Sequence, residues 1–366
     1  MAAERISIDQ FLSLSKQFSV IDVRSPGEYQ HAHIPGAYSL PLFTNEERAA
    51  VGTAYKQQSR EAAIKIGLDF FGPKMKTILE AAEAICIKNK QQSNKNAAED
   101  SGKTILVYCW RGGMRSGAVS WLLDLYGFKV FTLVAGYKKF RNHVLDTFSY
   151  PYQFNILGGY TGSGKTELLK KLQSNGEPVI DLEGIAGHKG SAFGNIGLPN
   201  QPTQEMFENV LAIKLAEEKI KFETTNKPIW LEDESQRIGH INIPSNLWNT
   251  MRQSPVFFLD IPFEERLKHI VQEYGVLDTQ KLVDATCRIK EKLGGLQTKQ
   301  VTENLQSGNH EEGFRILLKY YDKYYSKSLH NREGLNSLLN SIHCKSITTE
   351  NTSVLLHHTH SKTSEI

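Results

Sequence analysis

The sequence has few cysteines and no long hydrophobic run. Its 366 residues include four cysteines, Cys86, Cys109, Cys287 and Cys344, and these form neither a CxxC pair nor a zinc-ligand spacing. The pattern predicts free thiols in a reducing cytoplasm, without a resident metal. No apolar run is long enough to span a bilayer, and the first residues lack the segments of a secretory signal. We therefore expect a cytoplasmic protein that does not associate with membranes.

The sequence also lacks a strong imbalance of charge. The net charge is +3, with 23% charged and 40% hydrophobic residues, which is ordinary for a soluble globular protein. Domains dedicated to nucleic-acid binding are often strongly basic, so charge alone does not predict RNA binding. Basic residues do gather in Gly136–His143 and Lys88–Lys103, where a solvated surface is the usual explanation.

The length and the element pattern predict two α/β domains. A chain of 366 residues is too long for one ordinary core, and strands that alternate with helices indicate parallel sheets. We place the domains at residues 1–148 and 149–345, followed by a disordered tail at 346–366, and we expect a mobile loop at Lys88–Lys103. Expected strands are Phe18–Ser25, Thr104–Cys109, Lys129–Tyr137, Gln153–Gly159, Pro178–Glu183, Pro228–Ser235 and Ser254–Pro262.

One cysteine ends an apolar run and leads into a turn rich in glycine and arginine, ILVYCWRGGMRS (Ile105–Ser116). Cys109 ends the expected strand, and Gly112–Gly113 permit a sharp turn in which backbone N–H groups converge. Arg111 and Arg115 add positive charge, and the next helix adds its dipole. These features favour a thiolate nucleophile that faces an oxyanion, although a buried structural cysteine is the alternative.

The segment upstream of this loop resembles the rhodanese signature. Cys-x5-Arg spacing is found in tyrosine phosphatases and in rhodanese-like domains, and IDVRSPGEYQHAHIPGAYSLPL favours the second. The matching positions are Asp22, Arg24, Glu28, His33, Ile34, Pro35 and Gly36. We expect Arg24 and Glu28 to form a structural ion pair. The cysteine loop is longer than in sulfur-specific rhodaneses, which favours a phosphate-sized anion.

A second anion site is predicted at GYTGSGKT (Gly159–Thr166), which fits Gly-x4-Gly-Lys-Ser/Thr between an expected strand and helix. Its N–H groups and Lys165 would hold phosphate, and the Thr166 hydroxyl would meet Mg²⁺. The expected phosphate-binding residues are Gly159, Gly162, Ser163, Gly164, Lys165 and Thr166. Glu232 and Asp233 are candidates to orient a metal or water, with capping or surface positions as the alternative. The motif indicates a diphosphate or polyphosphate without specifying ATP.

Taken together, the two halves resemble the tRNA 2-selenouridine synthase family over roughly Ile6–Leu339. YCWRGGMRSGAVSWLL, LGGYTGSGKTELL, VIDLEGIAGHKGSAFG and WLEDESQRIG stand in the family's order. The third segment is foreign to generic rhodaneses and P-loop kinases, and a glycine-rich connector is its other explanation. The resemblance implies substrate contact for Asp181, Gly184, His188, Lys189 and Ser191. It also implies a rhodanese-like parallel-sheet domain followed by a P-loop NTPase-like α/β domain.

The same resemblance implies that selenium replaces the 2-thio sulfur of the wobble uridine in certain tRNAs. Selenophosphate and geranyl diphosphate are the implied co-substrates, and the geranyl group first alkylates the sulfur. Cys109 would carry the selenium or position selenophosphate, with Arg111 and Arg115 holding the oxyanion. The implied partners are tRNA and an enzyme that produces selenophosphate. We expect a monomer with no tightly bound cofactor, while a need for Mg²⁺ is left open.

Two other hypotheses remain open on the sequence. The first is a sulfurtransferase fused to a P-loop kinase or ATPase that acts on a small molecule. The second is a regulatory binding module whose first domain is inert. The intact Cys109 with both arginines of its loop argues against the second.

Overall fold

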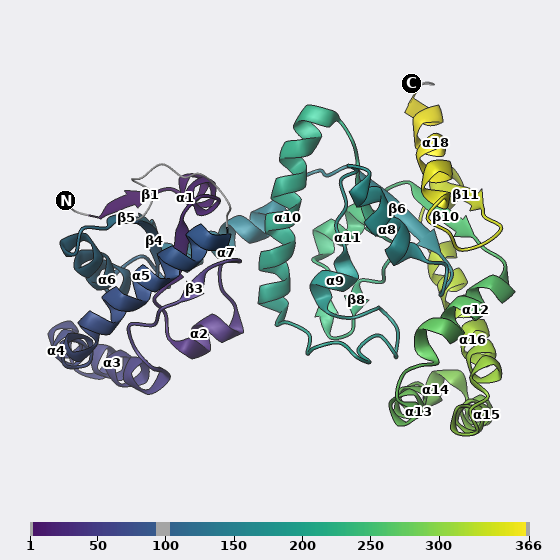
Figure 1. Ribbon diagram of the computed structural model, residues 1–366, viewed down its shortest axis with the longest axis horizontal. Coiled ribbons are helices and arrows are strands. Elements are labelled where there is room, and N and C mark those ends of the chain that lie inside the picture. The colour runs from purple at the N-terminus through teal and green to yellow at the C-terminus, as the bar shows by residue number, and fades with distance from the viewer. Residues whose placement is uncertain (1–2, 93–102, 364–366) are drawn as a thin grey trace. The chain divides into compact units, whose positions relative to one another are not determined.

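The chain folds into two compact units. The computed structural model describes residues 3–92 and 103–363, and it divides into Met1–Asp146 and Thr147–Ile366. Each unit contains a parallel sheet with helices around it (Figure 1), which confirms the predicted α/β class. Within the described ranges, we find no helix that combines the length and the apolar character needed to cross a membrane.

The first unit is built on a five-stranded parallel sheet in the order β1-β5-β4-β2-β3. The strand that feeds the cysteine loop, β4, is buried at every position and pairs with β5 on one side and β2 on the other. This central place explains its uninterrupted apolar sequence. The strands are β1 (Glu4–Ile6), β2 (Ser19–Asp22), β3 (Tyr38–Ser39), β4 (Thr104–Tyr108) and β5 (Lys129–Leu133).

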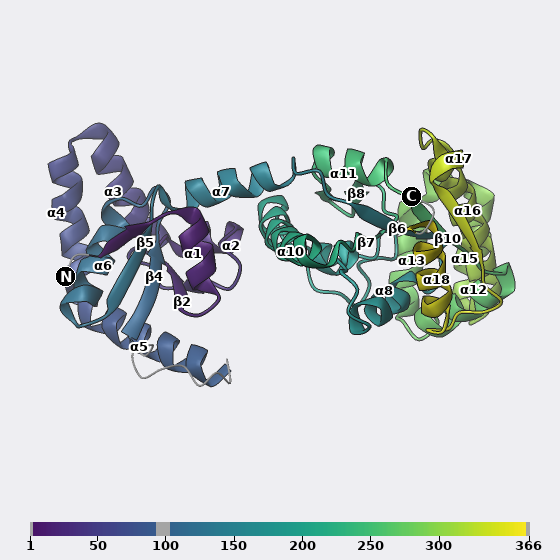
Figure 2. The same cartoon turned by 90° about the horizontal axis from the view of Figure 1, so that it is seen from above.

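The helices of the first unit begin at strong capping residues. Ser7, Ser25 and Thr44 each form a capping box with the residue three positions later. Two of the helices, α3 and α4, form a hairpin that both views show side by side (Figures 1 and 2). The helices are α1 (Ile8–Ser15), α2 (Pro26–His31), α3 (Asn45–Gln57), α4 (Arg60–Phe71), α5 (Met75–Gln92), α6 (Met114–Leu125) and α7 (Gly136–Thr147), with a 3₁₀ turn at Gly72–Lys74.

The second unit has a four-stranded parallel sheet in the order β11-β10-β6-β7 and a separate antiparallel pair, β8 and β9. The phosphate-loop strand β6 lies between β10 and β7, so its carboxyl end is flanked by the ends of two neighbours. The strands are β6 (Phe154–Gly159), β7 (Ile229–Glu232), β8 (Arg237–Ile238), β9 (Ile241–Asn242), β10 (Val256–Asp260) and β11 (Leu339–His343).

The helices of the second unit pack into two cores. One core lies along the sheet and includes Leu168, Leu172 and Trp230, while the other joins helices around Leu282, Val301 and Phe314. The helices are α8 (Lys165–Ser174), α9 (Leu182–Ala186), α10 (Gln204–Thr225), α11 (Ser245–Arg252), α12 (Phe263–Tyr274), α13 (Thr279–Arg288), α14 (Lys290–Leu293), α15 (Gly295–Gln306), α16 (His310–His330), α17 (Leu335–Leu338) and α18 (Asn351–Thr363).

Three local predictions need correction or comment. The strand predicted at Pro178–Glu183 is wrong, because only an isolated bridge from Val179 to Trp230 forms and α9 already begins at Leu182. The tail predicted to be disordered contains α18, whose Leu355 is fully buried in the core along the sheet. Of the loop predicted at 88–103, residues 88–92 continue α5, and residues 93–102 lie outside the described ranges.

Candidate functional site

The cysteine loop joins the carboxyl end of β4 to the amino end of α6. Cys109 directly follows β4 and is only 3% exposed, whereas Arg111 and Met114 are exposed. The helix then begins at Met114, so its N-terminal N–H groups follow the cysteine within one loop. The predicted strand-loop-helix setting of the thiol is therefore present.

Two glycines allow this loop to pack closely against the segment that follows β5. Gly112 has a φ of +61°, and a Cβ there would lie 2.5 Å from the carbonyl oxygen of Leu133. Gly136 has a φ of +57°, and a Cβ there would collide with the carbonyl oxygen of Cys109. The neighbouring backbone is tied to the loop by a 2.8 Å hydrogen bond from the Tyr137 N–H to the Cys109 carbonyl. A larger side chain at either glycine would push the cysteine loop and this segment apart.

The thiol has a hydroxyl neighbour that the sequence analysis missed. Cys109 Sγ lies 3.2 Å from Ser116 Oγ, and the Ser116 hydroxyl lies 3.1 Å from the Gly113 carbonyl, which can accept its hydrogen. When the sulfur is a thiolate, the same hydroxyl can turn and donate to it. The available signal was that Ser116 ends the quoted loop segment, which places it in the first turn of the helix that follows.

The two arginines of the loop have different surroundings. Arg115 donates a 2.7 Å hydrogen bond to Glu28, while Arg111 is exposed and lies in the wall of a groove. Burial raises the pKa of Glu28, but the hydrogen bond and charge of Arg115 outweigh it and hold that pKa below the ordinary value. The structure thus fixes Arg115 beside the thiol loop and leaves Arg111 available to a ligand.

The predicted ion pair between Arg24 and Glu28 is wrong. Arg24 is 1% exposed and pairs instead with Asp22, with 2.6 Å between Nη2 and Oδ2, and its guanidinium lies 3.9 Å from the ring centroid of Tyr137. Tyr108, the last residue of β4, donates a 2.8 Å hydrogen bond to Asp22. Asp22, two positions before Arg24 in the chain, binds the guanidinium, and Glu28 pairs with Arg115 instead. These contacts anchor the strand that presents Cys109.

The phosphate loop joins β6 to α8 as predicted. Lys165 Nζ donates a 3.0 Å hydrogen bond to the Gly159 carbonyl, which folds the lysine back over the loop. Gly162 and Gly164 have φ values of +80° and +72°, as a loop that turns its N–H groups inward requires. Ser163 Oγ is buried without a hydrogen-bond partner in the described chain. The loop therefore has the backbone form of an anion cradle.

Glu232, at the end of β7, is the acidic residue that faces this loop. Thr166 Oγ1 lies 3.4 Å from Glu232 Oε1, and the Glu183 N–H lies 3.4 Å from Glu232 Oε2. Thr166 and Glu232 fit the protein side of a Mg²⁺ site, whose other oxygen ligands would come from phosphate and water. Among the described residues, no group of three His, Cys, Asp or Glu side chains is arranged to hold a metal.

Glu232 belongs to a cluster of three carboxylates with Glu183 and Glu234. Burial, followed by the charge of the neighbouring carboxylates, raises the pKa of each to about 8, and Lys165 acts in the opposite direction. A Cβ at Gly190 would lie 2.8 Å from Glu234 and 3.2 Å from Glu183, so the glycine-rich segment passes close to the cluster. Sequence analysis missed Glu183 and Glu234, although both stand in the quoted DLEG and EDES segments.

Asp233 does not join this cluster. Its two oxygens accept hydrogen bonds from Arg332, at 2.5 Å, and from the Tyr325 hydroxyl, at 2.7 Å. The same hydroxyl accepts a 3.1 Å hydrogen bond from the Gly159 N–H. Asp233 therefore ties α16 to the base of the phosphate loop, and the structure does not bring it to the position predicted for a metal or water ligand.

The glycine-rich segment after α8 lies against the phosphate site, but several of its predicted contact residues already have partners. Asp181 caps α9 by accepting a 2.6 Å hydrogen bond from the Gly184 N–H. Lys189 forms an ion pair with Glu273. Ser191 Oγ accepts a 3.2 Å hydrogen bond from the Phe193 N–H. These residues shape the segment, and Lys189 keeps an exposed side chain while it is paired with Glu273.

His188, also predicted as a contact residue, is buried in this segment. It is 9% exposed and its Nδ1 has no hydrogen-bond partner among the described residues. Burial lowers the pKa of His188, with further contributions from the positive charge of His240 and Arg288. The ring is therefore favoured in its neutral form, and it lies against Gly194 and Gly239.

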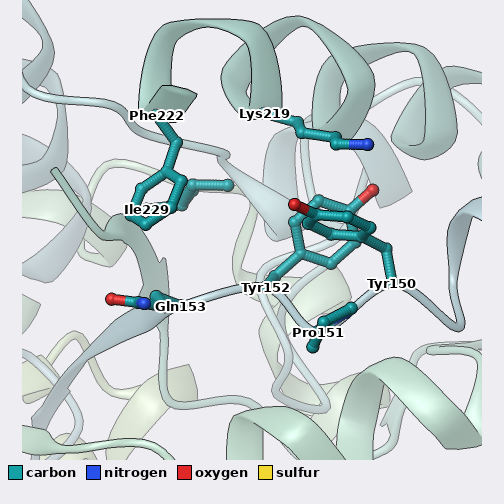
Figure 3. Close-up of a pocket in the computed structure, with 7 residues that line it drawn as sticks. All are labelled: Tyr150, Pro151, Tyr152, Gln153, Lys219, Phe222 and Ile229. Atoms are coloured by element: carbon teal, nitrogen blue, oxygen red, sulfur yellow. The ribbon is translucent and has the colours of Figure 1, made fainter. Parts of the chain in front are cut away.

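Two small cavities lie at different ends of the second unit. The cavity of Figure 3, about 10 Å³, is lined by Tyr150, Gln153 and Lys219 at the amino ends of β6 and β7. Ligands of open parallel sheets bind outside the carboxyl ends of the strands, so this cavity is not the candidate site. The other, about 30 Å³, is lined by Thr161 of the phosphate loop and by apolar and aromatic side chains such as Phe193.

Comparison with known proteins identifies both units. The family model described as tRNA 2-selenouridine synthase AAA domain matches residues 152–343, and the rhodanese-like domain model matches residues 7–143. A tRNA 2-selenouridine synthase of Bdellovibrio bacteriovorus is 35% identical over 91% of this chain and 94% of its own. Relatives with the same name are 33% identical in Nitrosomonas eutropha, over 86% and 89%, and 36% identical in Cronobacter sakazakii, over 74% and 68%.

Proposed function

The chain belongs to the tRNA 2-selenouridine synthase family, and from this premise we propose that it replaces the 2-thio sulfur of the wobble uridine in tRNA with selenium. We further propose that selenophosphate supplies the selenium and that geranyl diphosphate first activates the sulfur. The observation that carries this proposal is the presence of two anion cradles of different chemistry, one with a thiol and one with a lysine.

In the first step, the thiocarbonyl sulfur attacks the first carbon of the geranyl chain. A carbon–sulfur bond forms, the carbon–oxygen bond to diphosphate breaks, diphosphate leaves with the bonding pair, and the N3 proton of the base passes to solvent. The loop N–H groups and Lys165 stabilise this growing negative charge. Apolar and aromatic side chains beside Thr161, among them Phe193, offer the hydrocarbon a surface next to the phosphate loop. Where Mg²⁺ is bound, Thr166 and Glu232 would hold it and it would neutralise diphosphate charge.

In the second step, the selenium of selenophosphate attacks carbon 2 of the alkylated uridine. A carbon–selenium bond forms and the carbon–sulfur bond breaks, so that geranyl thiolate leaves with the bonding pair and takes a proton from water. Hydrolysis of the phosphorus–selenium bond then releases phosphate and leaves the selenium on carbon 2. Selenophosphate already holds selenium at the oxidation level of selenide, so carriage on Cys109 as a perselenide would need an oxidant. We therefore assign Cys109 the positioning of selenophosphate, with Arg111 and the loop N–H groups bound to its oxygens.

The test is to incubate the protein with 2-thiouridine tRNA, geranyl diphosphate and selenophosphate, and to analyse the nucleosides by mass spectrometry. S-geranyl-2-thiouridine should form without selenophosphate, and 2-selenouridine should form when it is added. If neither nucleoside appears, and ATP is hydrolysed without tRNA, the function is instead a sulfurtransferase fused to a kinase or ATPase. The P-loop contact between Thr166 and Glu232 also suits that second candidate.

A further inference from the structure

A groove opens beside the cysteine loop within the first unit. It has a volume of about 850 Å³ and runs between the α3–α4 hairpin and the start of α6. Figures 1 and 2 show this hairpin beside the sheet that carries β4. Arg111, Gly113 and Arg115 of the cysteine loop form part of its wall. The volume lies within the range of ordinary small-molecule sites, about 300–1,000 Å³, yet nothing in the two anion cradles requires it.

The groove exposes apolar side chains that a folded domain usually buries. Tyr55 is 53% exposed, Ile64 37%, Leu68 56% and Met114 49%, and all four line the groove. They come from α3, α4 and α6, so three separate helices contribute to one apolar surface. Contiguous exposed apolar surface of this kind marks a binding site more often than an accident of folding.

Positive charge surrounds this apolar surface. Arg48, Lys56, Arg60 and Arg111 line the groove together with Arg115, whereas no Asp or Glu of the described chain does. Arg48 and Arg115 share Glu28, but the other three form no ion pair with any described residue. A ligand that matches this groove has an apolar chain and anionic groups near it.

We propose that the groove binds the hydrocarbon chain of an S-alkylated nucleotide in RNA, with the phosphodiester groups on the surrounding cations. This inference rests on the proposed function and deepens it. The inference assigns the hydrocarbon to two different sites in the two steps. As geranyl diphosphate it binds at the phosphate loop of the second unit. After its transfer to the base, it lies along α3 and α4 while the base faces Cys109. Because Gly113 and Arg115 belong to both the groove and the thiol loop, a chain held there brings its sulfur to the exchange site.

Gly52 offers a test with a matched control. It lies in α3, lines the groove, and a Cβ at this position would meet no atom within 4 Å. Gly52→Phe should therefore place a ring in the groove that obstructs the hydrocarbon chain without a clash at its Cβ, while Gly52→Ala leaves the groove open. Leu68→Asp is a second variant, which places a charge on the apolar surface at an exposed position.

The probes are anticodon stem-loop RNAs that carry S-geranyl-2-thiouridine or S-methyl-2-thiouridine, with Kd measured by fluorescence anisotropy on the full-length protein. The wild type should bind the geranyl RNA at least about tenfold more tightly than the methyl RNA, because a buried chain removes apolar surface from water. Gly52→Phe and Leu68→Asp should lose this preference and convert the supplied geranyl RNA to 2-selenouridine slowly. Gly52→Ala should behave like the wild type.

Several outcomes would overturn the assignment. It is wrong if the wild type shows no preference, or if both groove variants keep it while melting at the wild-type temperature. It is also wrong if Gly52→Phe weakens only the binding of free geranyl diphosphate, since the groove would then serve the first step. Failure of the proposed function looks different, because the wild type would then prefer the geranyl RNA yet never form 2-selenouridine.

Discussion

The cysteine loop and the phosphate loop share one backbone plan but have opposite electrostatic surroundings. Each follows a buried central strand and precedes a helix, and each depends on glycines with positive φ. In the cysteine loop, Arg111 forms no ion pair with a described residue, and Arg115 is paired with a single carboxylate, Glu28. Around the phosphate loop, by contrast, Glu183, Glu232 and Glu234 lie close to the only lysine of the motif.

The difference bears on what each cradle needs in order to bind an anion. The first carries fixed positive charge, so it can accept an anion at once. In the phosphate loop, ionised carboxylates would repel a diphosphate, so they must be protonated or neutralised by a cation before the diphosphate binds. We infer that the binding of diphosphate depends on pH and on Mg²⁺ to an extent that the binding of selenophosphate does not.

The largest expected effects come from variants that remove one reaction step and leave the other intact. Cys109→Ala should lower the formation of 2-selenouridine by about 10²–10³-fold while S-geranylation continues, because the thiol loop takes part only in the proposed exchange. Lys165→Ala should lower S-geranylation by about 10²–10³-fold, yet geranylated RNA supplied directly should still be selenated. Mass spectrometry of the nucleosides measures both.

The control for these two variants is thermal unfolding, which should match the wild type. The division of labour is contradicted if Cys109→Ala also stops geranylation, or if Lys165→Ala also stops the exchange on geranylated RNA.

A second effect concerns the support of the cysteine strand. Arg24→Ala should destabilise the first unit by about 3–5 kcal/mol, because it leaves the buried carboxylate of Asp22 without its partner. Lys16→Ala, at an exposed position of the same unit, should change the free energy of unfolding by less than about 0.5 kcal/mol. Denaturant titration measures both free energies. If the two variants have equal effects, Arg24 does not anchor the strand that presents Cys109.

The sequence was enough to locate both loops for a simple physical reason. Buried central strands have apolar runs that few other elements share, and Gly-x4-Gly-Lys-Thr at Gly159–Thr166 restricts the backbone strongly. Local patterns of this kind depend on neighbours in the chain.

Pairings between distant residues were beyond the same reasoning. The partner of Glu28 is Arg115, which lies 87 positions away, while Arg24 forms its ion pair with the nearer Asp22. The strand predicted at Pro178–Glu183 had the right composition, but the Asp181 carboxylate caps a helix at that point. Such outcomes depend on which groups meet after folding, and a single sequence does not record them.

A third effect tests the acidic surroundings of the phosphate loop. Because burial and mutual repulsion raise the pKa of Glu234 to about 8, the carboxyl is neutral below that pH and charged above it. Without Mg²⁺, the wild type should therefore bind pyrophosphate more weakly as the pH rises from 7 to 9. Glu234→Gln should reduce this loss and bind about tenfold more tightly than the wild type at pH 9, since one buried charge is removed.

The free energy of unfolding should also fall as the pH rises. The folded protein keeps protons that the unfolded chain releases above a pKa of about 4.5, so the wild type loses stability as the pH rises from about 4.5 to about 8. Glu234→Gln should lose less over this window, whereas Glu217→Gln, at an exposed position of α10, should follow the wild type. Calorimetry measures the binding of pyrophosphate, and thermal melts at a series of pH values measure the stability. If the melting temperatures of all three proteins change with pH in parallel, Glu234 does not carry the proposed pKa shift.

The smallest expected effect sharpens the comparison at the thiol. Ser116→Ala removes the hydroxyl 3.2 Å from Cys109 Sγ but leaves every cation of the loop in place, so it separates the hydrogen bond from the fixed charge. One hydrogen bond contributes about 0.5–1.5 kcal/mol, which predicts a roughly two- to tenfold fall in the rate of exchange. Ser116→Thr should retain most of the activity, because it keeps the donor. If Ser116→Ala exchanges selenium as fast as the wild type, the hydroxyl takes no part in the exchange, and the contrast with the carboxylate-lined phosphate loop becomes one of charge alone.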